Sequence, residues 1–134
     1  MEAIAHFSLE KLPSYYPMRE YKRRLLFKDS QTAIIVHGDE VAAQFSCADW
    51  YVVMTQYDYF DGTSHWFYLI DKQLRRKDAC SPPDSFGFLQ DVEFVADACI
   101  QFGFYGSEQQ WSLAIVPQGF WSLRGKRYLR LNRV

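Results

Sequence analysis

Residues 50–71 read WYVVMTQYDYFDGTSHWFYLID, two aromatic and β-branched runs on either side of Asp61-Gly62. Asp-Gly between such runs is a strong signal for a β-hairpin, because a two-residue type I′ turn needs positive φ at both central positions. A turn at these two residues pairs positions that sum to 123, so that Asp58 faces His65. Both faces of this hairpin are apolar in their inner halves, which is typical of a central strand pair covered on both sides.

The rest of the chain extends the same pattern. Short apolar runs flank the turn at residues 37–40 and predict a hairpin of residues 32–36 with 41–47. Residues 92–104 alternate apolar with polar or small side chains, the period of one half-buried strand, and Pro117 is expected to end the strand that returns from it. Residues 8–12, followed by Pro13, are compatible with a helical turn. The remaining N-terminal segment, residues 1–20, is otherwise read as irregular.

Composition agrees with one β-rich domain over residues 1–134. The chain is 49% hydrophobic and 18% aromatic, and aromatic residues favour strands. We therefore predict an all-β fold, an antiparallel meander of about eight or nine strands that forms a sandwich or a half-open barrel. No membrane span or signal peptide is recognisable, and the three cysteines are expected to be reduced thiols of a cytoplasmic protein.

No phosphate-binding loop, zinc-binding motif or nucleophile elbow occurs, so we expect no cofactor and no metal. The predicted register makes Asp58 and His65 a possible acid–base pair, since a carboxylate that orients an imidazole is common in catalysis. Such a pair is more often an ordinary cross-strand contact at a hairpin end. A non-enzymatic role is therefore preferred.

The charges are segregated along the chain although the formal net charge is only −1. Fourteen of the fifteen lysines and arginines fall within residues 19–28, 72–77 and 124–133. Residues 29–71 hold seven acidic residues and residues 78–123 hold six, with no lysine or arginine in either stretch. Acidic groups beside aromatic anchors suit fast and tight binding of a basic protein. The predicted partner-binding residues are Asp39, Glu40, Asp58, Tyr59, Asp61 and His65.

A short all-β chain with these acidic stretches and with the aromatic, acidic hairpin end at residues 57–61 resembles the small cytosolic immunity proteins of bacterial contact-dependent and other polymorphic toxin systems. The resemblance implies a protein that carries out no reaction and that covers the active or substrate-binding surface of one toxin domain, often a basic nuclease.

Two other functions remain open. The basic clusters 19–28 and 124–133, the second with Tyr128 among its cations, could form a nucleic-acid groove on a small β-barrel. A ligand-binding or scaffold subunit would instead show a deep apolar cavity or a stable homo-oligomer.

Overall fold

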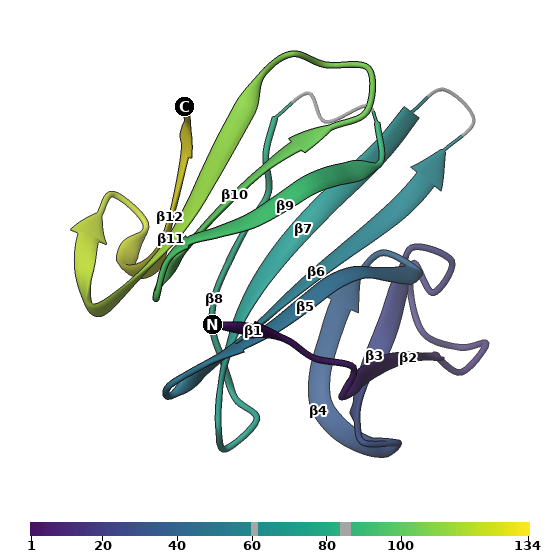
Figure 1. Cartoon of the computed structure of the whole chain (residues 1–134). Coiled ribbons are helices and arrows are strands. Elements are labelled where there is room, and N and C mark those ends of the chain that lie inside the picture. The colour runs from purple at the N-terminus through teal and green to yellow at the C-terminus, as the bar shows by residue number, and fades with distance from the viewer. Residues whose placement is uncertain (60–61, 84–86) are drawn as a thin grey trace.

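The computed structural model describes residues 1–59, 62–83 and 87–134. Within these residues the chain forms twelve strands and no helix. The strands make three antiparallel sheets (Figure 1). The prediction of an all-β fold is confirmed. The strands outnumber the eight or nine expected, and the prediction of a short N-terminal helix is wrong, because no helix occurs among the described residues.

The strands are distributed over the sheets as follows. The central sheet has the order β1-β5-β6-β7-β8 and consists of β1 (Glu2–Ala3), β5 (Glu40–Cys47), β6 (Trp50–Tyr59), β7 (Gly62–Asp71) and β8 (Arg76–Cys80). The four-stranded sheet has the order β12-β11-β10-β9 and consists of β9 (Leu89–Ala96), β10 (Cys99–Phe104), β11 (Gln110–Ser122) and β12 (Gly125–Arg133). The three-stranded sheet consists of β2 (Phe7–Lys11), β3 (Lys22–Phe27) and β4 (Ser30–His37).

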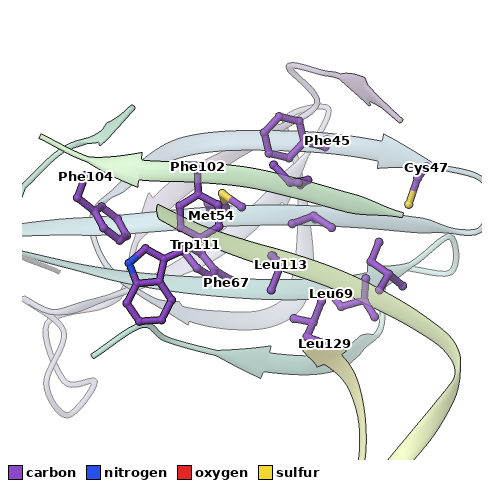
Figure 2. Close-up of a cluster of buried hydrophobic side chains, with 13 residues drawn as sticks. Phe45, Cys47, Met54, Phe67, Leu69, Phe102, Phe104, Trp111, Leu113 and Leu129 are labelled. Carbon is purple, nitrogen blue, oxygen red and sulfur yellow. The ribbon is translucent and has the colours of Figure 1, made fainter. Parts of the chain in front are cut away.

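The central sheet is covered on both faces, as its sequence predicts. Val53 and Tyr68 pack on one face in a cluster with Leu25 and other residues of the three-stranded sheet. Met54 and Phe67 pack on the other face with the four-stranded sheet, and Figure 2 shows these side chains between the two layers. The fold is therefore a sandwich of three layers.

The hairpin of β6 and β7 has a different register from the predicted one. Tyr59 pairs with Gly62 and Trp50 with Asp71, so that paired positions sum to 121. Gly62 therefore belongs to the ladder and is not a central turn residue, and the other predicted turn residue, Asp61, lies outside the described residues. A shift of two positions keeps every side chain on its predicted face, because side chains alternate with a period of two.

Residues 37–40 make a corner between two sheets and no hairpin. β4 belongs to the three-stranded sheet and β5 to the central sheet. The N–H of Gly38 donates to the carbonyl of Tyr21, and the N–H of Asp39 donates to the carbonyl of Gln56. The corner thus joins β4 to a strand of the other sheet, a non-local arrangement that the apolar pattern does not reveal.

A β-bulge in β5 puts Val41 and Phe45 on different faces of the central sheet, although simple alternation would put both on one face. Val41 pairs with Thr55, but Ala43 pairs with Met54. The extra residue turns Val41 toward the three-stranded sheet, whereas Phe45 lies in the core with the four-stranded sheet.

Three further predictions need correction. Residues 92–104 are two strands, β9 and β10, that turn between Ala96 and Cys99. β11 continues through Pro117 to Ser122. Its pairing with β12 is interrupted by a bulge between Ile115 and Phe120, so Pro117 lies where the ladder requires no backbone N–H. Residues 8–12 lie mostly in β2, which pairs with β3, since so short a segment gains more from a sheet ladder than from an isolated helical turn.

The carboxylate of Asp78 joins the edge strands of two sheets. It accepts hydrogen bonds from Arg127 Nε at 2.8 Å, from the Tyr128 N–H at 2.7 Å and from the Leu129 N–H at 2.8 Å. Its side chain is 7% exposed. β8 of the central sheet and β12 of the four-stranded sheet are thereby held together without a shared ladder.

We expect Gly38→Ala to destabilise the fold by about 2–4 kcal/mol. The φ of Gly38 is +98°, and a Cβ there would lie 2.9 Å from the Gln56 carbonyl oxygen and 3.1 Å from Thr55 Cβ. Gly125→Ala is the matched control, since its φ is +104° and a Cβ would meet nothing within 4 Å. Urea unfolding measures both variants. An equal loss in the two would show that the corner imposes no steric constraint.

We expect Asp78→Ala to lower the free energy of unfolding by about 3–5 kcal/mol, because it leaves the Nε of a partly buried guanidinium and two backbone N–H groups without their acceptor. The control is Arg75→Ala, which removes an ion pair to Asp71 whose arginine is 69% exposed, and we expect it to cost about 1 kcal/mol or less. Similar losses in thermal unfolding would contradict the role of Asp78.

Candidate functional site

Three tyrosine rings meet at the end of the central hairpin. Tyr57 and Tyr59 lie two positions apart in β6 and so share a face, with ring centroids 4.7 Å apart. Tyr21, just before β3, lies 5.2 Å from Tyr57 and 6.2 Å from Tyr59. Tyr59 is 39% exposed. We call these three residues the tyrosine cluster.

Tyr21 reaches the cluster through the pairing of sheets. Lys22 pairs with His37 at the start of β3, and the corner at Gly38 holds the Tyr21 carbonyl. Residues 36 positions apart in the chain thereby form one surface. Sequence reasoning missed Tyr21, because its position depends on this non-local pairing.

A shallow pocket of about 430 Å³ adjoins the tyrosine cluster. Its lining combines both signs of charge with one ring, and the residues are Lys11, Arg19, Glu20, Arg23, Asp39 and Tyr57. Arg23 Nη1 donates to the carbonyls of Arg19 and Lys22, each at 2.9 Å, which fixes its guanidinium at the pocket wall.

Loss of contact with water raises the pKa of Tyr57, and the neighbouring Tyr21 and Asp39 raise it further. The phenol therefore stays neutral at physiological pH and can both donate and accept a hydrogen bond. The pocket offers hydrogen bonding and both signs of charge beside apolar ring faces.

Glu40 and Asp58 lie on the opposite face of the hairpin. Glu40 is exposed and accepts a hydrogen bond from Gln56 Nε2 at 3.1 Å. Asp58 is exposed and accepts one from Thr63 Oγ1 at 3.2 Å. Of the predicted acids that the structure describes, only Asp39 shares a pocket with the tyrosine cluster, and Asp61 lies outside the described residues.

His65 lies in the interior, and its predicted pairing with Asp58 is wrong. The register places it opposite Gln56, with 1% of its surface exposed and its ring centroid 4.6 Å from that of Phe104. Neither ring nitrogen has a hydrogen-bond partner, and burial lowers its pKa to about 4. The acid–base alternative loses the contact on which it rested.

The basic clusters 19–28 and 124–133 lie in different layers. The first supplies β3 of the three-stranded sheet and the second supplies β12 of the four-stranded sheet, on opposite faces of the central sheet. The single groove that would use both clusters is not formed. Arg19 and Arg23 instead lie around Asp39, so the hairpin end is a surface of mixed charge.

The three thiols are free. Burial raises the pKa of Cys80 to about 12 and also raises that of Cys47, so both remain protonated at neutral pH. Protonated thiols are poor nucleophiles and poor metal ligands. Within the described ranges, no three His, Cys, Asp or Glu side chains are grouped so as to hold a metal ion.

Neither the protein-family models nor the curated proteins nor the solved structures contain a match to this chain. The part of the chain described by the structure contains no helix with the length and apolarity needed to cross a membrane. The function of the chain is therefore inferred from the geometry of its surface.

We expect His65 to make the fold sensitive to acid. Because its pKa is about 4 in the folded state and about 6.5 when unfolded, the unfolded chain binds the proton more readily. The free energy of unfolding is therefore unaffected by His65 well above pH 6.5. It falls as the pH is lowered below that value, by about 3 kcal/mol at pH 4. Urea unfolding at pH 7 and at pH 4 measures this loss.

The matched variant is His65→Leu, which replaces the buried imidazole by an apolar side chain that does not titrate. Carboxylates titrate over the same range in both proteins, so the difference between them isolates His65. If the two proteins lose equal stability between pH 7 and pH 4, the burial of a neutral imidazole is not the cause.

Proposed function

We propose that this chain is a non-enzymatic protein-binding domain that neutralises a bacterial toxin domain by covering its active or substrate-binding surface. The observation that carries the proposal is the tyrosine cluster beside the mixed-charge pocket. Tyrosine and arginine are enriched at the residues that dominate binding energy, and a rigid ring gives contact area at a low entropic cost. The cluster lies at the outer end of the central hairpin, beyond the buried core.

The acidic side of the hairpin end supports a partner with a basic patch. Asp39 borders the pocket, and Glu40 and Asp58 are exposed on the other face of the same end. Opposite charge on the partner would raise the association rate, and the contact with the tyrosines would lower the dissociation rate. Arg19 and Arg23 add a requirement for an acidic or carbonyl acceptor within the same interface. Such a mixed pattern favours one cognate partner over many basic proteins.

The proposal places the protein in the cytoplasm, with its thiols reduced. A toxin that reaches that compartment would be bound there before it meets its substrate. No group of this chain takes part in the toxin's chemistry, so neutralisation follows occupancy alone.

The test begins with capture of a partner by the tagged protein from its own cells. The captured protein is then expressed with and without this chain. We expect growth arrest by the partner alone and rescue when the chain is present. A captured protein that is harmless, or whose toxicity the chain does not relieve, would overturn the toxin-neutralising function.

Within that test we expect Tyr59→Ala combined with Asp58→Ala to weaken partner binding at least tenfold, with little loss of thermal stability because both side chains are exposed. Trp121→Ala is the control, since Trp121 is 79% exposed and lies near the end of β11, in the four-stranded sheet. Isothermal titration calorimetry measures both. If Trp121→Ala weakens partner binding and the double variant does not, the tyrosine cluster is not the interface.

A further inference from the structure

A second surface, on the four-stranded sheet, has a different character from the tyrosine cluster. A groove of about 530 Å³ runs along β12 beside the end of β8, and Arg127, Arg130 and Arg133 line it. No carboxylate is among the described residues of its lining. Asp78, on the neighbouring strand, is already paired with Arg127. Among the described residues, neither Arg130 nor Arg133 forms an ion pair.

Aromatic rings hold these guanidinium groups at the groove. The guanidinium carbon of Arg130 lies 4.6 Å from the ring centroid of Phe120, and that of Arg133 lies 5.3 Å from the ring centroid of Trp111. Both arginines are exposed at the same time. A cation held over a ring loses less freedom when it binds an anion, which favours a ligand with negative charges along its length.

Phe120 and Arg127, which line the groove, pair with each other next to the exposed end of the β11–β12 hairpin. Beyond the bulge, Trp121 pairs with Lys126 and Ser122 with Gly125. This end extends past the last residues of β11 that pair with β10, and Figure 1 shows it projecting from the sheet. Trp121 is 79% exposed and is accompanied by the exposed cations Arg124 and Lys126.

We propose that the groove along β12 and the adjoining hairpin end bind single-stranded nucleic acid. The phosphates would contact Arg130 and Arg133 in the groove and Arg124 and Lys126 at the hairpin end, and a base would stack on Trp121. A strand of nine residues spans about 30 Å, enough for a short run of nucleotides. Aspartate and glutamate side chains would use the cations but carry no flat ring to place on the indole, whereas each nucleotide supplies both a phosphate and a base, so the exposed Trp121 favours a nucleic acid.

The test measures fluorescence anisotropy of labelled 15-nucleotide oligothymidylate and oligouridylate with the full chain. We expect binding that weakens steeply between 50 and 200 mM salt, because each phosphate contact releases counterions. Arg130→Gln combined with Arg133→Gln should reduce affinity at least tenfold and flatten the salt dependence. Trp121→Ala should reduce affinity about 5- to 100-fold and leave the salt dependence unchanged, because stacking releases few counterions.

The matched control is Lys28→Gln combined with Arg76→Gln, which removes two exposed charges outside the groove and should change affinity less than twofold. If this control loses as much affinity as the Arg130→Gln, Arg133→Gln protein, binding depends only on net charge and the proposed site is wrong. The Tyr59→Ala, Asp58→Ala protein should bind the oligonucleotides normally, which separates this inference from the proposed function.

Two competitors complete the test. Polyglutamate and vesicles of phosphatidylglycerol carry negative charge without bases. If either binds as tightly as the oligonucleotides and depends equally on Trp121, the ligand is an acidic protein or an anionic membrane and the inference is wrong. Absence of oligonucleotide binding at 50 mM salt would also overturn it.

Discussion

The requirement to bury both faces of the β6–β7 hairpin governs the architecture. Val53 and Met54 are adjacent in the chain and are both fully buried, although their side chains point in opposite directions. Neither outer sheet alone would exclude water from both. The chain therefore supplies a three-stranded sheet before the hairpin and a four-stranded sheet after it, and each contributes one apolar face to a separate core. Apolar burial at about 25 cal/mol per Å² makes this double cover the main stabilising term.

Three stacked sheets leave edges that need other means of attachment. β8 and β12 are edge strands of different sheets, and the Asp78 carboxylate joins them through two backbone N–H groups and the Arg127 guanidinium. Burial of a charge is costly unless its hydrogen bonds are satisfied, and here several donors converge on one group. The pair of Arg75 and Asp71 has almost the same nitrogen–oxygen distance and a carboxylate that is similarly buried, but its arginine is 69% exposed, against 24% for Arg127. The burial of the cation, more than the distance, distinguishes these two ion pairs.

Local patterns determined which face each central residue occupies, but not which segments meet. The shift in hairpin register left every face unchanged, because the error was an even number of positions. The corner at Gly38 and the bulge in β5 escaped prediction, since turn residues and alternation look the same in a hairpin and in a change of sheet. The same limit applies to the candidate site. Asp39 and Tyr59 were identified from their local sequence, whereas Tyr21 arrives through pairing between distant strands and His65 lies in the interior.

The segregation of charge along the chain has a different meaning once the layers are known. The basic cluster at residues 19–28 folds against the acidic corner and produces a mixed surface, whereas the cluster at residues 124–133 follows an edge strand with one buried acid, already paired. A net charge of −1 is thus compatible with one surface suited to a protein and another suited to a polyanion. The exposed aromatics separate in the same way, with Tyr59 at the end of β6 in the central sheet and Trp121 near the end of β11 in the four-stranded sheet. Burying a large apolar side chain is worth about 1.5–3 kcal/mol, and Trp121 gains little of this in the isolated chain. A ligand that covers the ring would recover it, so the two ends of this fold are the places where binding energy is available.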